Sequence, residues 1–190
     1  SVGGALVMNA GAYGGETRDV LSKAQAINRA GECETFEVAD FGYGYRYSQL
    51  ARERPELIWI AAFFQGSSES PDRLHREIED IRARREATQP IRAQTGGSTF
   101  KNPTAEQLEQ AGLEPGTKAW MLIERVGGRE LQIGGARISE KHGNFMLNTG
   151  EASASDLEDL GEELRARVKD QFGLELEWEI RRVGIAKKPG

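Results

Sequence analysis

The sequence predicts a mixed α/β (α+β) fold in two parts, residues 1–87 and residues 88–190. Two observations predict the mixture. A continuous apolar run at 57–64 is typical of a strand, and a regular apolar spacing at 155–172 is typical of a helix. A third observation predicts the division, because the polar, glycine-containing residues 88–103 interrupt the pattern and place a domain boundary at their start.

The opening segment, residues 1–15, is rich in glycine and carries no charged side chain. Glycine lets the backbone adopt positive φ and lie close to a neighbour, so tightly packed backbone is expected here. Consecutive N–H groups in tight turns can also bind an anion, which leaves a structural and a ligand-binding interpretation open. The segment matches neither the GxGxxG dinucleotide pattern nor the GxxxxGK[ST] phosphate loop.

Three strands are predicted in the first part. Residues 20–28 and 33–38 have the composition of strands, and the residues at 28–31 are typical of a turn between them. The run at 57–64 is apolar and contains β-branched and aromatic residues, which predicts a buried strand.

A helix is predicted after the third strand. Ser70 is suited to the N-cap and Pro71 to the first helical position. The pattern ends near Ala87. Residues at spacings of four and three form one apolar face: Leu74, Ile78 and Ile81.

The second part alternates between short helices and strands. We expect a short helix at 118–125 and strands at 131–133 and 144–148. Residues 174–183 alternate enough between apolar and polar side chains to predict a final strand.

The clearest helix of the chain is predicted at 155–172. Ser155 and Glu158 fit a capping box at its start, and Gly173 fits the position just after its end. Its apolar stripe consists of Leu157, Leu160, Leu164 and Val168.

Composition excludes several classes of protein. The formal net charge is −5, from 25 Lys and Arg against 30 Asp and Glu, which argues against general binding of nucleic acid. No apolar run approaches the roughly 20 residues that span a bilayer, so no membrane segment is expected, and no secretory signal is visible. With Cys33 as the only cysteine, no internal disulfide can form, and a metal site is not expected. A reducing cytoplasm fits this composition.

Ser98 is the first candidate for chemistry, within Gly96-Gly97-Ser98-Thr99-Phe100-Lys101-Asn102-Pro103. The two preceding glycines expose its hydroxyl, and Lys101 and Asn102 add a cation and an amide nearby. A serine needs an adjacent base to act as a nucleophile, and there is no GxSxG elbow. Two interpretations stay open: a turn or capping serine, or a hydroxyl that donates a proton.

Arg46 and Glu179 are further candidates. Arg46 lies among tyrosines, so it could stack on their rings or hold a carboxylate through two hydrogen bonds. Glu179 shares one predicted strand face with Glu175 and Glu177, which is typical of a solvated surface. From local pattern, His142 is a surface turn histidine.

The order of these segments along the chain resembles a known family. The succession SVGGALVMNAGAYGGE, YRYS, RREATQP, GGSTFKNP, AWMLIE, IGGARISEKHGNFMLNTG and LEWEIRRVG resembles UDP-N-acetylenolpyruvoylglucosamine reductase (UDP-N-acetylmuramate dehydrogenase) from residue 1 to about residue 184. The pair GGSTFKNP and ISEKHGNFMLNTG is the most specific part of this resemblance.

The resemblance implies both a fold and an activity. The fold would be part of an FAD-binding domain of the vanillyl-alcohol-oxidase type (1–87), followed by a smaller α+β substrate-binding domain (88–190). The activity would be that of a bacterial cytoplasmic flavoprotein oxidoreductase of peptidoglycan synthesis, and so of cell wall biogenesis, cell shape and cell division. In that reaction NADPH reduces FAD, and UDP-N-acetylglucosamine enolpyruvate is reduced to UDP-N-acetylmuramate. The complete enzyme would be a monomer.

The resemblance also assigns roles to particular residues. Ser98 matches the proton donor, while Arg46 and Glu179 match the residues that stabilise and polarise the enolpyruvyl group. The cofactor would contact residues of the opening segment: Val2, Gly3, Gly4, Asn9, Gly11, Ala12 and Tyr13. The nucleotide-sugar substrate would contact Tyr45, Asn102 and His142.

The chain departs from the family pattern in two respects. A tyrosine-bearing insertion between Phe64 and Pro71 is missing, which indicates the shorter form of the enzyme. The family's segment before Ser1 is also missing, so we expect this polypeptide alone to be inactive or weakly active. The alternatives are a non-enzymatic module that binds a UDP-sugar, or another flavin oxidoreductase of the same superfold.

Overall fold

The computed structural model describes residues 1–184 and divides into two compact units, one from Ser1 to Ser70 and one from Pro71 onward. Helix α4 (Pro71–Thr88) is grouped with the second unit, although none of its residues is buried. The domain boundary between residues 87 and 88 stays a prediction.

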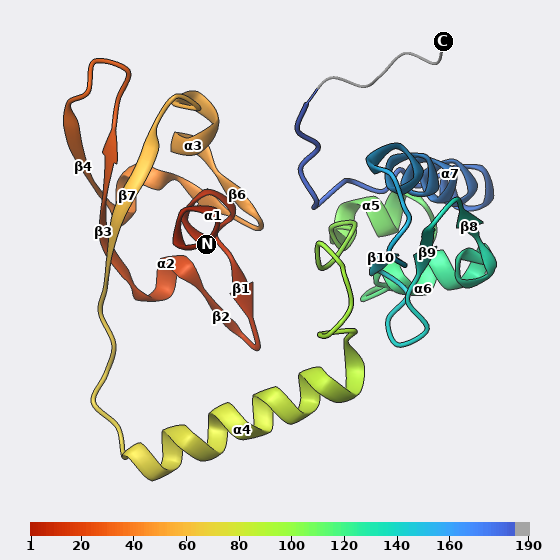
Figure 1. Ribbon diagram of the computed structural model, residues 1–190, viewed down its shortest axis with the longest axis horizontal. Coiled ribbons are helices and arrows are strands. Elements are labelled where there is room, and N and C mark those ends of the chain that lie inside the picture. Colours follow the sequence, from red (N-terminus) through yellow and green to blue (C-terminus); the bar gives the residue numbers. More distant parts are fainter. Residues whose placement is uncertain (185–190) are drawn as a thin grey trace. The chain divides into compact units, whose positions relative to one another are not determined.

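The first unit is built on a three-stranded antiparallel sheet in the order β4-β3-β7 (Figure 1). Its strands are β3 (Leu21–Ile27), β4 (Cys33–Glu37) and β7 (Ile58–Phe64). In the central strand, Ala24 pairs with Phe36 on one side and with Ala62 on the other. The three predicted strands of this unit and the turn after Ile27 are confirmed.

Short helices and two hairpins with two-residue strands complete the first unit. They are α1 (Val2–Met8), β1 (Gly11–Ala12), β2 (Gly15–Glu16), α2 (Thr17–Val20), η1 (Val38–Phe41), β5 (Tyr43–Gly44), β6 (Tyr47–Ser48) and α3 (Gln49–Glu53). Leu6 of α1, Ala24 and Ala26 of β3 and Phe41 of η1 are fully buried in one apolar core. This core fixes the sheet against α1 and against the segment that carries the β5–β6 hairpin.

The glycine-rich opening segment contains a helix that the sequence did not predict, α1. The Ser1 hydroxyl accepts a hydrogen bond from the Gly4 N–H at 3.2 Å, and Asn9 ends the helix in the left-handed conformation with φ 42°. Glycine in a helix costs about 1 kcal/mol relative to alanine. Burial of the Leu6 side chain contributes about 2 kcal/mol, which is enough to offset much of that cost.

Strand β7 forms as predicted, but it is not buried. Ile58 is 66% exposed and Ile60 51% exposed, while Trp59 between them packs against the core. Side chains alternate between the two faces of a strand, and only the face that carries Trp59 lies against the core. A continuous apolar run cannot distinguish a strand covered on both faces from one covered on a single face.

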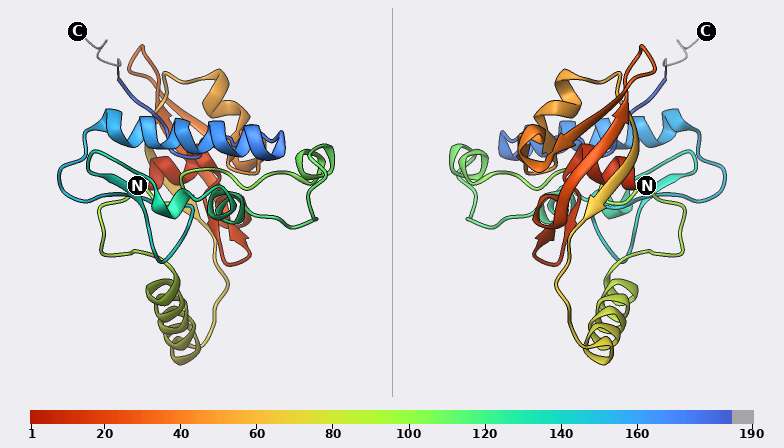
Figure 2. Two further views of the ribbon diagram at one scale, coloured as in Figure 1. Left: turned by 90° about the vertical axis from the view of Figure 1, so that its right-hand side faces the viewer. Right: turned by 90° about the vertical axis from the view of Figure 1, so that its left-hand side faces the viewer.

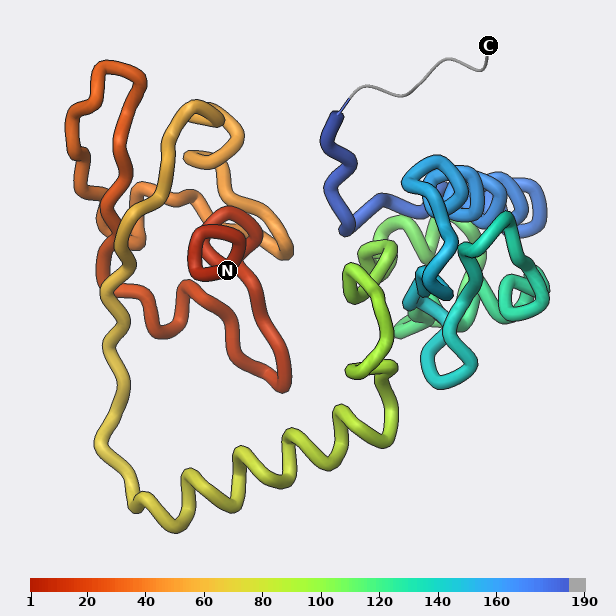
Figure 3. Tube along the Cα trace, viewed as in Figure 1, coloured from red at the N-terminus to blue at the C-terminus, as the bar shows by residue number. Residues whose placement is uncertain are grey.

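Helix α4 has nearly the predicted bounds, yet its apolar face is uncovered. Leu74 is 42% exposed and Ile78 is 46% exposed. Figure 3 shows α4 as one uninterrupted coil in yellow and green. Its apolar spacing therefore predicted the helix correctly without identifying a partner surface.

The second unit packs helix α7 (Ala154–Phe172) against a three-stranded antiparallel sheet in the order β10-β9-β8 (Figures 1 and 2). Its other elements are α5 (Ala105–Gln110), α6 (Ala119–Arg125), η2 (Gly128–Glu130), β8 (Gln132–Ile133), β9 (Ala136–Ile138) and β10 (Met146–Asn148). Leu160, Leu164 and Val168 of α7 are fully buried together with Leu122 and Ile123 of α6. The predicted helix at 118–125 and the strands at 131–133 and 144–148 are confirmed to within two residues.

The start of α7 differs from the predicted capping box. Ser153, not Ser155, is the N-cap: its hydroxyl accepts from the Asp156 N–H, and the Asp156 carboxylate accepts from the Ser153 N–H. Both serines are followed three residues later by an acidic side chain, so the pattern alone could not separate them. Gly173 ends the helix with φ 67°, as predicted.

The predicted final strand at 174–183 was wrong. The segment makes one isolated antiparallel bridge, between Phe100 and Trp178, instead of a continuous ladder. The Lys101 N–H donates to the Glu177 carbonyl at 2.8 Å, and the Glu179 N–H donates to the Thr99 carbonyl at 2.9 Å. Its side chains still alternate between core and solvent: Leu174 and Leu176 are buried, whereas Glu175 and Glu177 are exposed.

Candidate functional site

In the first unit, Arg46 lies at the tip of the β5–β6 hairpin. Its backbone has φ 51°, in the left-handed region that side chains other than glycine rarely adopt. The guanidinium donates to the Gly11 carbonyl at 2.7 Å and to the Asn9 carbonyl at 3.4 Å, and it lies 5.0 Å from the centre of the Tyr45 ring. Stacking and hydrogen bonding therefore both hold this arginine in place.

A pocket of about 450 Å³ opens beside this arginine. Its walls include Gly11, Ala12 and Tyr13, together with Tyr45 and Arg46. Five residues that the resemblance assigned to cofactor, substrate or catalysis thus come together at one place. Val2, Gly3 and Gly4 lie in α1 instead, and they are not among the residues that line this pocket.

Gly11 is required sterically where β1 meets its neighbours. A Cβ at this position would lie 2.7 Å from the Gly15 carbonyl oxygen and 3.2 Å from Nη1 of Arg46. Such a contact would push the β1–β2 hairpin away from the guanidinium. Gly15, on the opposite strand, has open space around its own Cβ position.

Asn9 is a fully buried polar residue behind the same pocket. Its Nδ2 donates to the Glu16 carboxylate at 2.9 Å and to the Gly44 carbonyl at 3.1 Å, and its Oδ1 accepts from the Arg18 N–H. These bonds tie the β1–β2 hairpin to the β5–β6 hairpin. The structure therefore places the Asn9 side chain inside the protein, where it shapes the pocket.

Tyr43, at the base of the β5–β6 hairpin, carries the single buried side-chain polar atom without a hydrogen-bond partner in the described part of the chain, its hydroxyl oxygen. Burial raises the pKa of this phenol, and the ring stacks on Phe41 at 4.8 Å. A buried hydroxyl without a partner costs free energy.

In the second unit, Ser98 lies on an extended segment that pairs with the segment of Phe145 and with the segment of Glu179. Ser98 pairs with Phe145 in an antiparallel bridge, and the next residue, Thr99, is fully buried. The Thr99 carbonyl accepts from the N–H groups of Glu179 and Ile180 at 2.9 and 3.3 Å. The backbones that carry Ser98 and Glu179 are thus neighbours.

Glu179 is half-buried, whereas Glu175 and Glu177 are exposed. Its neighbours Trp178 and Ile180 pack against the core of the second unit. The Trp178 ring lies against α7 at Gly161, where a Cβ would be only 2.0 Å from the indole Cη2, and the indole Nε1 donates to Glu162 at 3.0 Å. Packing of Trp178 on α7 therefore anchors the segment that carries Glu179.

Asn102 and His142 are both half-buried in the second unit. The Asn102 Oδ1 accepts from the Ala119 N–H at 3.2 Å, at the first residue of α6. The His142 Nδ1 accepts from the Asn144 N–H at 3.2 Å. Burial of the ring, followed by the positive charge of Arg129, lowers the pKa of His142, and the Glu124 carboxylate opposes this shift.

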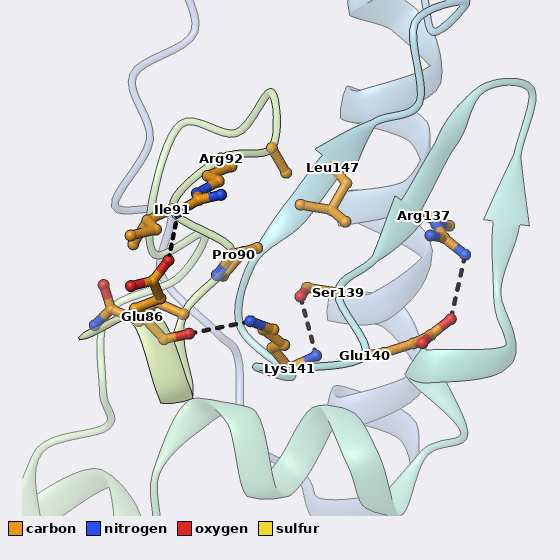
Figure 4. Close-up of a pocket in the computed structure, with 11 residues that line it drawn as sticks. Glu86, Pro90, Ile91, Arg92, Arg137, Ser139, Glu140, Lys141 and Leu147 are labelled. Atoms are coloured by element: carbon orange, nitrogen blue, oxygen red, sulfur yellow. Dashed lines mark hydrogen bonds and ion pairs between the residues drawn. The ribbon is translucent and has the colours of Figure 1, made fainter. Parts of the chain in front are cut away.

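Two further pockets in the second unit were not predicted from the sequence. One of about 400 Å³ is shown in Figure 4, with the cationic side chains of Arg92, Arg137 and Lys141 around the buried Ser139 hydroxyl. Arg92 pairs with Glu86, Arg137 with Glu140, and Lys141 donates to the Glu86 carbonyl. The other, of about 470 Å³, is lined by apolar side chains that include Met146, Leu157, Trp178 and Ile180.

Arg46 belongs to the first unit, while Ser98, Asn102, His142 and Glu179 belong to the second. Within the second unit the structure brings Ser98 and Glu179 onto adjacent backbone segments. No group of acidic, histidine or cysteine side chains suited to a metal ion was found among residues 1–184. Within the same range, no helix has both the length and the apolar character needed to cross a membrane.

The fold resembles that of a solved reductase. The crystal structure of UDP-N-acetylenolpyruvylglucosamine reductase from Thermus caldophilus aligns with a TM-score of 0.71 and 32% sequence identity, over 93% of this chain and 59% of that one. The chain thus has a mixed α+β fold of this class of reductase.

The sequence comparisons identify the family. The model of the C-terminal domain of UDP-N-acetylenolpyruvoylglucosamine reductase matches residues 89–183. Reductases of that name from Parvibaculum lavamentivorans and Phenylobacterium zucineum are 52% and 50% identical, over 100% and 97% of this chain. The chain belongs to the UDP-N-acetylenolpyruvoylglucosamine reductase family. It spans 57% of the length of each of these two relatives.

Proposed function

We propose that this chain carries the reducing site of an FAD-dependent UDP-N-acetylmuramate dehydrogenase. The reaction is the NADPH-driven reduction of UDP-N-acetylglucosamine enolpyruvate to UDP-N-acetylmuramate in cytoplasmic peptidoglycan synthesis. The observation that carries the proposal is the juxtaposition of Ser98 and Glu179 across Thr99, inside the region that the family model matches.

Ser98 is proposed to protonate the substrate. Addition of hydride to one alkene carbon leaves negative charge on the second carbon and its carboxylate, and that second carbon must then take up a proton. A hydroxyl within hydrogen-bond reach can donate it, and a contribution of about 10²-fold or more is typical of such a group. The backbone of Ser98 is held by its bridge to Phe145 and by the buried Thr99, which supports this role.

Arg46 is proposed to hold the carboxylate of the enolpyruvyl group. A guanidinium can form two parallel hydrogen bonds with a carboxylate and opposes the negative charge that develops there. The contacts of Arg46 with the Gly11 carbonyl and the Tyr45 ring fix the guanidinium before substrate arrives. Positioning in advance avoids reorganisation during the reaction.

Glu179 is proposed to polarise the enolpyruvyl group beside Ser98. A carboxylate next to a developing anion stabilises it only if the carboxyl group is protonated or shares a hydrogen-bonded bridge. Glu179 is less exposed than Glu175 and Glu177, which distinguishes it from these two neighbouring carboxylates.

The pocket beside Arg46 is suited to part of an FAD molecule. Gly11 lets β1 lie close to Gly15 and Arg46 at the pocket wall, Tyr13 is 51% exposed, and Arg46 offers a positive charge to an anionic group. Gly11, Ala12 and Tyr13 would hold the cofactor directly, while the buried Asn9 keeps their hairpin in place. FAD bound there would supply the hydride chemistry of the reaction, while these residues would hold and orient it. The first unit would then be part of a vanillyl-alcohol-oxidase-type FAD domain.

Tyr45, Asn102 and His142 are proposed to contact the nucleotide-sugar. Tyr45 is exposed beside Arg46, so its ring can meet the sugar or the enolpyruvyl end. Burial and Arg129 lower the pKa of His142, and its Nδ1 accepts from the Asn144 N–H, so Nε2 of the neutral ring can donate a hydrogen bond to the nucleotide-sugar. The complete enzyme is proposed to act as a monomer.

The first test is the visible absorbance spectrum of this chain after incubation with FAD and removal of free flavin. A matched sample is the chain fused to the part of the Parvibaculum reductase that it does not match. We expect a retained, shifted flavin band in the fusion, with NADPH oxidation that depends on the UDP-enolpyruvyl sugar. A fusion that folds but binds no flavin would contradict the proposal.

A second candidate function is a flavin-independent module that binds a UDP-sugar. The observation that favours it is that the second unit has its own apolar core and contains the whole region matched by the family model. Titration of the chain with UDP-N-acetylglucosamine in the absence of FAD tests this. Tight binding without flavin, together with a fusion that does not turn over substrate, would favour the module.

A further inference from the structure

Asn144 is a polar side chain that is only 4% exposed, located just before β10. Both ends of its amide bind the backbone of one residue, Phe100. Oδ1 accepts from the Phe100 N–H at 3.0 Å, and Nδ2 donates to the Phe100 carbonyl at 2.7 Å. The Asn144 side chain thus takes the place of the peptide group of a neighbouring strand.

The backbone around Asn144 holds the same segment. The Thr99 N–H donates to the Asn144 carbonyl at 2.7 Å, and the Met146 N–H donates to the Thr99 hydroxyl at 3.2 Å. On the other side of the segment, the Thr99 carbonyl receives the Glu179 N–H. The two residues that follow Ser98 are therefore fixed from both sides.

We infer that Asn144 is the positioning residue for Ser98 and Glu179, through the two hydrogen bonds of its amide to Phe100. The link to catalysis rests on the proposed function, whereas the link to the backbone does not. A proton donor must lie within hydrogen-bond reach of the reacting carbon, and a displacement of about 1 Å can cost 10²-fold in rate. Phe100 is two residues from Ser98 and pairs directly with Trp178, beside Glu179.

Only an amide side chain can make both bonds. An aspartate keeps an acceptor for the Phe100 N–H but places a second acceptor against the Phe100 carbonyl. A leucine has nearly the same shape and makes neither bond. Asn144→Leu and Asn144→Asp therefore remove the bonds to different degrees, and the milder variant still tests the inference if the other does not fold.

Asn148 provides a matched control in the same β10 region. Its amide also bonds only to backbone, donating to the Ala152 carbonyl at 3.1 Å and accepting from the N–H groups of Gly150 and Ala152. These bonds order the 149–152 turn and do not contact the Ser98 segment. Asn148→Leu should therefore lose a similar set of hydrogen bonds without releasing Ser98.

The decisive experiment is amide hydrogen exchange of the 190-residue chain, followed residue by residue by NMR. With α7 amides as the internal reference, Asn144→Leu should speed exchange at Thr99, Phe100 and Glu179 by about tenfold or more. Asn144→Asp should do so less at Phe100, and Asn148→Leu should leave all three sites unchanged. Equal exchange at these sites in wild type and both Asn144 variants would overturn the inference.

The catalytic consequence is measured in the FAD-loaded fusion by separating the two half-reactions. Asn144→Leu should slow reduction of the enolpyruvyl sugar about tenfold or more and raise its solvent deuterium isotope effect, while NADPH still reduces the flavin at the normal rate. An equal loss in both half-reactions would overturn the positioning role in catalysis. If Ser98→Ala leaves sugar reduction unchanged, the proposed function of Ser98 fails, while hydrogen exchange still decides the role of Asn144.

Discussion

The two units hold their candidate residues in different ways. Arg46 lies at a hairpin tip with positive φ, and its guanidinium is bound by carbonyl groups at the rim of an open pocket. Ser98 lies on an extended segment whose following residues, Thr99 and Phe100, are fully buried. In the proposed function, the charged group that meets an anionic substrate can stay at the surface, whereas the neutral proton donor depends on the rigidity of the core behind it.

The two units also differ in how far their apolar side chains are buried. In the first unit the edge strand β7 leaves Ile58 and Ile60 exposed, while in the second unit α7 covers the sheet with three fully buried apolar side chains. We therefore expect substitutions near Ser98 and Glu179 to couple more strongly to stability than substitutions near Arg46.

The largest expected effect is a loss of stability when the contact between Gly161 and the Trp178 ring, next to Glu179, is overpacked. Gly161→Ala places a methyl group about where the Trp178 ring lies, because the new Cβ would be 2.0 Å from the indole Cη2. Overpacking of this kind should lower the free energy of unfolding of the second unit by about 3 kcal/mol. Urea unfolding monitored by tryptophan fluorescence measures the change.

A compensating change controls for helix effects, since alanine is itself a better helix former than glycine. In the double variant Gly161→Ala with Trp178→Leu, the smaller side chain should restore part of the lost stability relative to Gly161→Ala alone. If Gly161→Ala is as stable as wild type, the close packing of Trp178 on α7 does not exist in solution.

Ser98→Ala should abolish proton donation without changing the fold. In the FAD-loaded fusion, reduction of the enolpyruvyl sugar should fall about 10²-fold, equivalent to about 2.7 kcal/mol, while NADPH still bleaches the flavin. Stopped-flow absorbance of the two half-reactions separates these outcomes. Equal slowing of both would argue that Ser98 shapes the site and does not donate the proton.

Gly11→Ala tests close packing in the first unit, as Gly161→Ala does in the second. Its Cβ would meet the Gly15 carbonyl oxygen at 2.7 Å, so the β1–β2 hairpin should shift and stability should fall by about 2 kcal/mol. Gly15→Ala is the matched control, because its Cβ position is open. Thermal unfolding of both variants gives the comparison, and equal behaviour of the two would refute the steric argument.

The smallest expected effect is a pH dependence from His142. Because burial and Arg129 lower the pKa of this imidazole in the folded state, the unfolded chain takes up its proton more readily. The contribution of His142 to stability should be complete above about pH 6.5, the ordinary pKa of histidine, and should be lost as the pH falls below that value.

Unfolding free energies at about pH 7.5 and 5.5 measure this contribution. The loss of stability between the two pH values should be smaller in His142→Gln than in wild type. His75→Gln, in the exposed helix α4, is the matched control and should behave as wild type. A wild-type pH dependence in His142→Gln would assign the effect to other groups.

Most of the longer regular elements could be predicted from local pattern, whereas the short hairpins and helices between them were not predicted. The strands at β3 and β4 and the helix α7 follow directly from apolar spacing and from turn or capping residues. Helix α1 could not be predicted in this way, because its glycines disfavour a helix and its stability depends on burial of Leu6 against the sheet. The final segment alternates like a strand, yet it pairs through isolated contacts with residues 99–101.

The candidate site was predicted only in part. Ser98, Arg46 and Glu179 followed from the order of motifs in the sequence, and the roles assigned to them stay predictions. Asn144 was overlooked, since one asparagine in a sequence gives no sign that it will be buried. Its neighbours in GNFM are apolar, and a polar residue among buried ones was the one available signal. The partner of its amide, Phe100, is 44 residues away.

The sequence by itself determined the family, most of the longer strands and helices and the identity of the candidate residues, because these depend on local spacing and on motif order. Tertiary structure alone decided that Asn9 is buried, that Asn144 binds Phe100 and that Gly161 accommodates Trp178. These features depend on contacts between residues far apart in the chain. Their free energy comes from burial and from hydrogen bonds formed only when the segments meet.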